Sequence, residues 1–442
     1  MKLLEDLKRN WPFFIVIFIV CMICEKINII SIPVGIGSIM FLPMLFAMVI
    51  ALVLYLIKGF KFVGPQQHAI SDVLVVVGIS TFIAKVSVVS GVAIPQVIEA
   101  GPALLLQELG NLGTMVIALP LALYFGFKRE SVGMTHSIAR EPNVAIIAQK
   151  YGLNSPEGEG VIMTYVVGTL VGTIFMGLLA SLLATATPLH PLAMAMACGV
   201  GSGSMMAASS APLILNFPEL ETEITAFAAT SNVLSTADTV FITVLIGLPL
   251  CNWLYKVLEP KLGKGRSVEK VEKSSAAASF EEPASERSDT FGGRFVENLV
   301  VILITGFISW VGNFIYSKGN VGLVETIPGM LILMAIAVAG LTIAQCVPKI
   351  PAVIWITVIG IFLAMPYNPV TSGFVVDQVN KIQMLPLATP ILAYAGVTMG
   401  KNWEDFKHIG WKGILIACFV MFGTFIGSAL VAQVVLSVTN VI

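Results

Sequence analysis

Apolar residues fall into long runs without a charged side chain, and the short segments between them hold nearly all of the charge. A helix that crosses the hydrocarbon core of a bilayer needs about 20 apolar residues. The main charge-free runs are Asn28–Ile57, Leu109–Phe127, Val161–Pro218, Leu299–Ser317, Thr326–Pro348, Ile350–Val376, Ile382–Gly400 and Gly413–Ile442. Their number and length predict an all-α polytopic membrane protein with about 10–12 transmembrane segments, some of them broken or re-entrant.

The composition agrees with this pattern. Of 442 residues, 57% are hydrophobic and 12% are charged, with a mean hydropathy of +0.91, whereas soluble proteins are about 25% charged. The net charge is −1, so no excess positive charge attracts nucleic acid, and the expected partner is the lipid bilayer. The six cysteines lie in apolar segments without a histidine or carboxylate cluster, so we expect packing roles and no bound metal.

The basic residues predict the orientation, because lysine and arginine collect on the cytoplasmic side of a membrane. They cluster at the amino terminus and in Lys128–Lys150, Lys256–Arg294 and Lys401–Lys412, and they are absent near Ser31–Gly35. This distribution predicts a multi-pass protein of the bacterial cytoplasmic (inner) membrane whose amino terminus is cytoplasmic.

Four regions follow from the pattern. We expect scaffold helices in residues 1–64, a core transport region with broken helices in 65–258, a disordered cytoplasmic linker in 259–293 and a carboxy-terminal helical repeat in 294–442. Asp72–Gly113 and Ala352–Gly400 share an apolar helix, a Ser-Gly pair and a proline-bearing helix that ends in glycine. Inverted repeats are typical of secondary transporters, although chance similarity between apolar helices explains this likeness equally well.

The first candidate site is the glycine- and serine-rich segment Cys198–Ala211. Each glycine weakens a helix by about 1 kcal/mol relative to alanine, and a helix broken here directs free N–H groups and a dipole end at an anion. The alternative is close helix packing through small residues, as we expect for Gly423 and Gly427. The substrate-binding residues predicted here are Gly201, Ser202, Gly203, Ser204, Ser209 and Ser210.

Two further candidates lie before this segment. In Gln107–Thr114, Glu108 is either a ligand for a coupling ion or a residue at the water interface, and Gln107, Asn111 and Thr114 are expected to contact substrate. In the loop Thr135–Asn143, His136 titrates near neutrality and Arg140 can bind a carboxylate with two hydrogen bonds. A role for His136 and Arg140 in gating or in attracting the anion competes with simple positive-inside placement.

The fourth candidate is Asp238. A carboxylate inside a membrane is energetically costly and is by default a functional hypothesis. With Asn232, Ser235 and Thr239 nearby on the same predicted helix, Asp238 suits Na⁺ or H⁺. The alternative is an ion pair with Lys85, the lone charge between Val73 and Ile98.

Three segments resemble LrgB/CidB-type membrane proteins, the group that includes the plastid glycolate/glycerate transporter. They are ELGNLGTMVIALPLALYF, HSIAREPNVAIIAQKYG and HPLAMAMACGVGSGSMMAAS, within Glu108–Tyr255. The chain resembles still more closely an uncharacterised bacterial family of polytopic membrane proteins. The resemblance implies a transporter of small organic acids with inverted repeats, its site lined by Asn111, Thr114, Ser137, Asn143 and Gly201–Ser204. The usual Thr-Thr-Pro is replaced by Ala139–Pro142, and the histidine of the glycine-serine helix is missing.

Enzyme motifs such as a Walker loop, a dinucleotide fingerprint or a zinc-protease helix are absent from the sequence. We therefore expect no enzyme, but a secondary active transporter of a small organic anion such as a monocarboxylate, acting as a homo-oligomer, a dimer. Na⁺ or H⁺ drives it, and no cofactor other than a coupling Na⁺ is expected. The alternatives are a monovalent cation/proton antiporter and a non-transporting membrane regulator of cell-wall hydrolase export.

Overall fold

The fold is that of a computed structural model, which describes residues 9–34, 37–57, 60–138, 141–152, 155–263, 288, 290–347, 350, 352–401 and 403–442. Helices make up most of the described chain, and the one sheet among these residues is a two-stranded hairpin. The amino-terminal elements are α2 (Trp11–Ile27), β1 (Ile30–Val34), β2 (Gly37–Phe41), α3 (Pro43–Leu56), α4 (Pro65–Val92), α5 (Ile94–Glu99), α6 (Gly101–Leu106), η1 (Gln107–Leu112), α7 (Gly113–Tyr124), α8 (Glu130–Thr135), α9 (Glu141–Tyr151) and α10 (Pro156–Ala186).

The remaining elements continue the helical pattern through to the carboxyl end. They are α11 (Pro191–Cys198), α12 (Gly203–Asn216), η2 (Pro218–Leu220), α13 (Glu221–Ile242), η3 (Thr243–Gly247), α14 (Leu248–Leu262), α15 (Phe291–Tyr316), α16 (Leu323–Cys346), α17 (Ala352–Ala364), α18 (Ser372–Asn380), α19 (Met384–Lys401) and α20 (Trp403–Val438). Most of the expected linker, residues 264–287 and 289, lies outside the described residues, and helices occupy both of its ends as far as Leu262 and from Phe291.

The all-α, multi-pass membrane architecture expected from the sequence is confirmed. By length and composition, six described helices can span a membrane, or seven if the bent pair α18 and α19 forms one span. This number is lower than the expected 10–12 crossings because several apolar runs fold into shorter helices, such as α3 and α17. The run Val161–Pro218 is divided among α10, α11 and α12, with breaks at its prolines and glycines.

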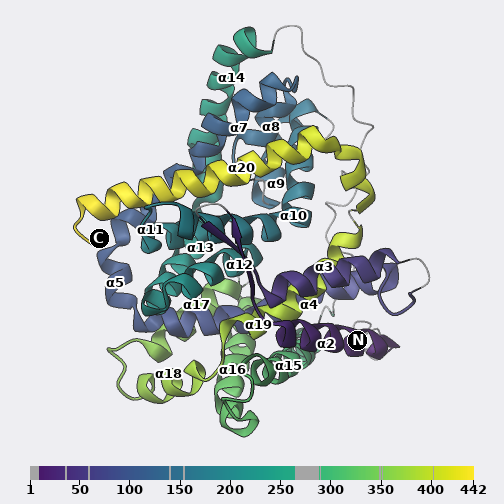
Figure 1. The fold of residues 1–442 in the computed structure, drawn as a ribbon, viewed down its shortest axis with the longest axis vertical. Coiled ribbons are helices and arrows are strands. Elements are labelled where there is room, and N and C mark those ends of the chain that lie inside the picture. Colours follow the sequence, from purple (N-terminus) through teal and green to yellow (C-terminus); the bar gives the residue numbers. More distant parts are fainter. Residues whose placement is uncertain are drawn as a thin grey trace.

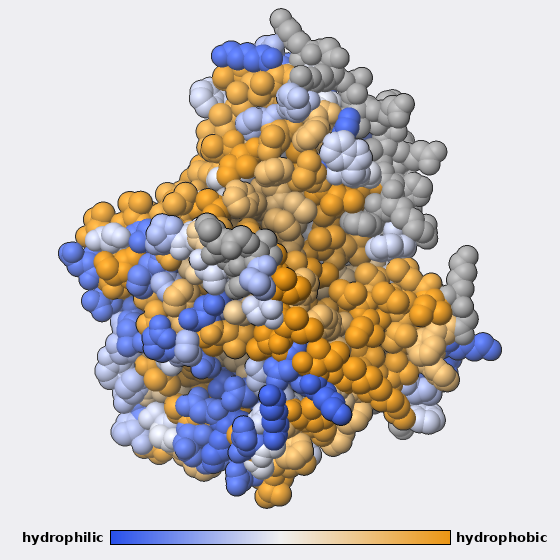
Figure 2. Space-filling view, in the orientation of Figure 1, coloured by the Kyte–Doolittle hydropathy of each residue, from blue (hydrophilic) through white to orange (hydrophobic). Residues whose placement is uncertain are grey.

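One face of α2 carries a row of exposed apolar side chains. Trp11, Ile15, Ile19, Ile23 and Ile27 recur every four residues along one face of α2, and each is 46–61% exposed. Apolar side chains exposed in this way along a whole helix face are expected where hydrocarbon replaces water. Figure 2 shows the same contrast at larger scale, with an apolar surface over α2 and α3 and a polar one over α18.

The buried side chains form two hydrophobic clusters. The smaller one joins α2 and α3 to α4, α15 and α19, with Phe13 and Tyr394 among its largest members. The larger one contains α10 to α13 and most of α20, which crosses the molecule in Figure 1 and packs against η1, α7, α10 and α11. The hairpin extends from the first cluster to the second, where Met40 N donates to Ser181 Oγ of α10 at 2.9 Å.

Glycines set the distance between α20 and the polypeptide around η1. A Cβ added to Gly110 would lie 2.3 Å from the carbonyl carbon of Gly427, and one on Gly113 would lie 2.5 Å from the oxygen of Gly423. Backbones this close admit no side chain at either position. The packing role expected for Gly423 and Gly427 is thus what the structure shows.

The two similar sequence segments fold into the same order of elements. In Asp72–Gly113 the long helix α4 is followed by the short helix α5 and then by α6, which continues into the 3₁₀ helix η1. In Ala352–Gly400, α17 is followed by the short helix α18 and by α19, and α18 and α19 are bent by 65°. The leading helices pack directly on each other, since a Cβ on Gly91 would lie 2.8 Å from the Ile361 oxygen. This order agrees with a repeat, which stays a prediction.

Candidate functional site

Three helices are interrupted in the neighbourhood of Glu108. The span Gly101–Tyr124 changes to a 3₁₀ helix at η1, which includes Glu108 itself. The helix that would join α11 to α12 is broken at Gly199–Ser202, where Gly201 has φ +158°. Between α13 and α14 the chain forms the π-helical turn η3. Such departures from α-helical bonding are common at functional sites, and the break predicted within Cys198–Ala211 is present.

Glu108 is the centre of a buried hydrogen-bond network. Its side chain is fully buried. Gln107 Nε2 donates to Oε1 at 2.5 Å and Asn111 Nδ2 donates to Oε2 at 2.7 Å, while Ser235 Oγ of α13 also donates to Oε1. Three donors on a carboxylate stabilise its ionised form and offset part of the cost of burying the charge.

A small cavity lies against this carboxylate. Its water-accessible volume is about 10 Å³, close to the minimum that holds one water molecule. Among the described atoms at its wall, Asn111 Oδ1 and His136 Nε2 are buried and have no hydrogen-bond partner. Gln107 Oε1, of the residue that precedes Glu108, also has none among the described residues. The residues that line the cavity are Glu108, Asn111, Leu112, His136, Ser137, Ile242, Thr243 and Gly247.

His136 presents an electron pair to the cavity. Its Nδ1 lies 3.0 Å from the Gly133 oxygen and 3.2 Å from the Val132 oxygen. Because carbonyls only accept, Nδ1 carries the proton and Nε2 is an acceptor. Burial lowers the pKa of His136 from 6.5 to about 4, despite the two carbonyls, which favour the charged form. The imidazole is therefore neutral at physiological pH.

Side chains beyond the cavity fix its walls. Asn143 Nδ2 donates to Ser137 Oγ at 2.5 Å, and Asn143 Oδ1 accepts from Thr243 Oγ1 of η3 at 2.8 Å. Thr114 Oγ1 donates to the Thr135 oxygen at 2.8 Å and so ties α7 to the end of α8. These bonds hold the loop after α8 against α7 and η3.

The helix break between α11 and α12 is joined to the Glu108 network by α13. Asn232 Nδ2 donates to the Gly199 oxygen at 2.8 Å and to the Gly201 oxygen at 2.9 Å. Ser231 Oγ accepts from Gln107 Nε2 at 3.0 Å and donates to the Met196 oxygen at 2.7 Å. A continuous polar connection thus runs from the broken helix to the buried carboxylate.

The serines of α12 form a separate group. Ser202 caps the helix by accepting from Met205 N, and its Oγ lies 2.9 Å from Ser204 Oγ, which in turn lies 3.3 Å from Thr173 Oγ1. Ser202 and Ser204 are half-buried. Ser209 and Ser210 donate to carbonyls one turn back within α12. None of these four serines lines the cavity beside Glu108.

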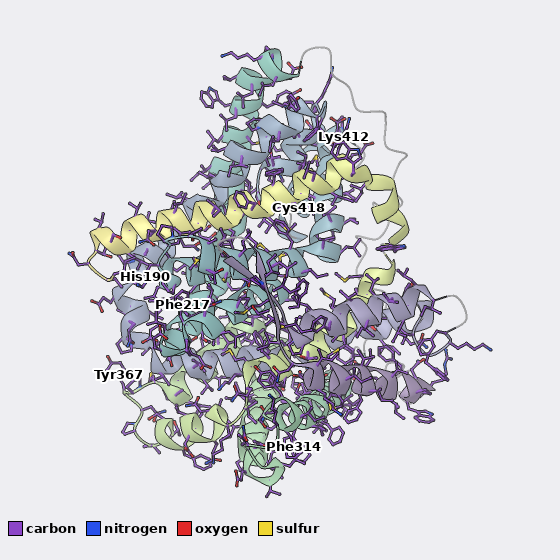
Figure 3. All side chains as sticks on the ribbon, in the orientation of Figure 1. His190, Phe217, Phe314, Tyr367, Lys412 and Cys418 are labelled. Carbon is purple, nitrogen blue, oxygen red and sulfur yellow. The ribbon has the colours of Figure 1, made fainter. Side chains whose placement is uncertain are left out.

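A second polar group lies between α8, α10 and α14. Arg129 Nε donates to Glu157 Oε1 at 2.7 Å, and Arg129 Nη1 donates to Asn252 Oδ1 at 3.0 Å. The guanidinium also lies over the Tyr255 ring, 5.1 Å from its centre. Each partner is satisfied by another within this group, so we assign it to holding the helix ends together. A further tie joins His190 N to Gln433 Oε1 at 2.7 Å; Figure 3 shows His190 near the end of α20, on which Lys412 and Cys418 lie.

The structure brings together residues predicted in three separate candidate segments, Gln107–Thr114, Thr135–Asn143 and the helix that contains Asn232 and Ser235. Glu108, Asn111 and Ser137 line the cavity, and Gln107 and Ser235 donate to Glu108. Thr114, Asn143 and Asn232 hold the neighbouring segments. Arg140 lies outside the described residues, as do the side chains of Asp238 and Thr239, although their backbone belongs to α13. Lys85 donates to the Val379 oxygen at 3.0 Å and to Asn380 Oδ1 at 3.4 Å, at the end of α18.

Two members of the network were not predicted. Ser231 precedes Ser235 by four residues, the spacing that places both on one helix face, and this periodicity was a usable signal. Thr243 contacts Asn143 across 100 residues of sequence, and no local pattern indicates such a pairing.

The part of the chain that matches a known family includes this site. A family model described as a protein of unknown function, DUF3100, matches residues 22–257, from within α2 to within α14, and so includes Glu108, the helix break and η3. No curated protein and no solved structure matches the chain. The chain belongs to the DUF3100 family of proteins of unknown function.

Proposed function

We propose that this protein is a secondary active carrier in which Glu108 binds a coupling cation, Na⁺ or H⁺. The observation that carries the proposal is the nature of the cavity wall. The wall includes a buried carboxylate and two acceptor atoms without partners among the described residues, Asn111 Oδ1 and His136 Nε2. Such a wall attracts a cation, and a cavity of one water molecule's size leaves room for little else.

The transported solute is proposed to be a small organic anion, such as a monocarboxylate. The support is the broken helix between α11 and α12, because the start of a helix offers N–H groups and a partial positive charge to a carboxylate. Ser202 and Ser204 stand there, half-buried, with hydroxyls available for further hydrogen bonds. Asn232 contacts the break and Ser235, one turn later, contacts Glu108, so α13 offers a short path for coupling between the two sites.

The break and the interrupted span at η1 also agree with the way secondary transporters place discontinuous helices at their binding sites. The resemblance to LrgB/CidB-type proteins points to the same class of solute. We further propose the bacterial cytoplasmic membrane as location, a cytoplasmic amino terminus and a dimeric state, as the sequence predicts.

A monovalent cation/proton antiporter is the second candidate. It is favoured by the cavity beside Glu108, which is lined by cation-binding groups and not by the serines of α12. An antiporter needs the cation site alone.

Transport by the purified protein in proteoliposomes separates these functions. The carrier requires both a small monocarboxylate outside and an inward Na⁺ or proton gradient for uptake, and Ser204→Leu abolishes uptake. The antiporter exchanges Na⁺ for protons with no organic anion present. If neither carboxylate uptake nor Na⁺/proton exchange is observed, and Ser204→Leu has normal activity in cells, the results support the non-transporting regulator and refute the proposal.

A further inference from the structure

A second carboxylate is buried in the other hydrophobic cluster, far along the chain from the Glu108 network. Glu25 lies in the last turns of α2 and is 1% exposed. Neither of its carboxylate oxygens has a hydrogen-bond partner among the described residues. This sets Glu25 apart from Glu108, which accepts from three side chains, and from Glu157, which pairs with Arg129 at 2.5 Å.

The surroundings of Glu25 are apolar or weakly polar. Its Cγ lies 3.5 Å from the point where Gly312 of α15 would carry a Cβ, and Pro386 of α19 lies beside the same point. Thr389 of α19 is a polar neighbour. Thr305 and Ser309 lie seven and three residues before Gly312 and so share its helix face. The hydroxyl oxygens of Thr305, Ser309 and Tyr394 are among those that lack a hydrogen-bond partner within the described chain.

No described cation is available to neutralise Glu25. On α2 itself, the neighbouring groups are the buried thiols of Cys21 and Cys24, and Lys26 is exposed. On α15, Tyr316 is near, whereas Arg294 and Glu297 lie 18 and 15 residues from Gly312, roughly 20–27 Å along the helix. The other described titratable groups on the packed helices are Tyr55 on α3 and Tyr394 on α19. Lys381, between α18 and α19, bonds to Gln378 and Asp377.

An ionised carboxylate in this place would have no counter-ion among the described residues, and the one hydroxyl beside it, that of Thr389, donates to the Leu385 oxygen at 3.1 Å. Burial of a charge with so little compensation is costly. Protonation removes the charge and turns one carboxyl oxygen into a donor for a neighbouring hydroxyl. A proton also needs no added space and no ring of ligands. We therefore propose that Glu25 is a proton-binding site, occupied in this conformation and separate from the cation site at Glu108.

Glu25 lies next to the joint of the bent span. Asn313, the residue after Gly312, bonds both sides of the joint: Nδ2 donates to the Lys381 oxygen at 3.2 Å, and Oδ1 accepts from Gln383 N at 2.7 Å. Lys85 bonds the end of α18 at Val379. A movement that straightens the 65° bend between α18 and α19 would change the packing against Gly312 and admit water to Glu25. Release of the proton is thereby linked to the shape of the joint.

The test is carbodiimide modification of the full chain in membranes. Dicyclohexylcarbodiimide partitions into apolar sites and adds to a protonated carboxyl group, giving a stable acylurea that mass spectrometry locates on a peptide. We expect modification of Glu25 at pH 6 that falls at least tenfold at alkaline pH, and no comparable modification of Glu157 in the same sample, because Glu157 is paired with Arg129. A water-soluble carbodiimide should leave Glu25 unmodified.

Failure to modify Glu25 at pH 6, while its peptide is recovered and the protein is folded, would overturn the proposal. So would equal modification by the two reagents, or protection by Na⁺ at constant pH, which would indicate a sodium site. Thermal unfolding gives a second measurement. The wild type should lose Tm as pH rises above about 4.3, the ordinary pKa of glutamate, because the unfolded chain then releases the proton that the folded chain keeps. Glu25→Gln should lose less. Equal losses would contradict the proposal. Neither measurement requires transport, so failure of the proposed carrier function leaves both interpretable.

Discussion

Substitutions at Glu108 separate its electrical role from its structural one. In Glu108→Gln the remaining carbonyl oxygen can still accept from Gln107 and Ser235. The new amide would face Asn111 Nδ2, a donor, but Asn111 Oδ1 has no partner. Rotation of the Asn111 amide by half a turn therefore restores a hydrogen bond. Charge-assisted bonds become neutral ones, while the buried charge disappears, so we expect a net change within about 2 kcal/mol.

Glu108→Ala has a different effect. It leaves the three donors of Gln107, Asn111 and Ser235 without their acceptor in a buried site. Each unsatisfied donor costs about 1–3 kcal/mol, which together approaches the whole stability of many domains. With a change in Tm of about 2 °C per kcal/mol for a large domain, the alanine variant should unfold roughly 5 °C or more below the glutamine variant.

The assay is thermal unfolding of detergent-purified variants, followed by intrinsic fluorescence. Glu99→Gln on α5 is the matched control, because Glu99 is an exposed carboxylate of the same region and its neutralisation should leave Tm unchanged. An alanine variant as stable as the glutamine variant would show that the donors are not held by the carboxylate, and the interpretation of the network would then be wrong.

Three further predictions concern the framework around the cavity. Gly110→Ala should destabilise the protein by about 1–3 kcal/mol or prevent insertion, because its Cβ would meet the backbone of α20. Gly101→Ala is the control and should be neutral or stabilising, because its Cβ would have nothing within 4 Å. Equal Tm values for the two variants would contradict the close contact between η1 and α20. Asn232→Ala should cost about 1–3 kcal/mol in denaturant unfolding, since two buried carbonyls lose their donor; an unchanged midpoint would refute it. His136 has a pKa near 4 when folded and 6.5 when unfolded. Its contribution to stability is therefore complete above pH 6.5, and up to about 3 kcal/mol is lost as pH falls to 4. His136→Gln should reduce the fall of Tm at acid pH, and an unchanged fall would count against a buried neutral imidazole.

The sequence predicted those features that depend on local pattern. Charge-free runs indicated membrane helices, and three glycines within Gly199–Gly203 indicated a broken helix, because both signals act through nearby residues. The spacing of Gly423 and Gly427 likewise predicted a close crossing. The polar residues around Glu108 were identified as a group, although their burial, which decides between an ion ligand and an interfacial residue, was not determined by the sequence.

Features that depend on tertiary contacts were not predicted. Glu25 follows directly on an apolar run and precedes Lys26, a pattern that is typical of a helix end at the interface. Its burial results from α15 and α19, which follow more than 260 residues later. The orientation of α13 was predicted only in part: Ser235 faces Glu108, but its partner on that face is Ser231, while Asn232 contacts the helix break. Contacts of this kind require the fold itself.

We propose that the carboxylate of Glu108 carries the charge that couples an ion gradient to transport. Ion flux into proteoliposomes that contain either wild type or Glu108→Gln, driven by an imposed Na⁺ or pH gradient with a monocarboxylate present, tests this role. We expect gradient-driven flux in the wild type and none in Glu108→Gln, although the variant folds. Undiminished flux in Glu108→Gln would show that this carboxylate does not bind the coupling ion.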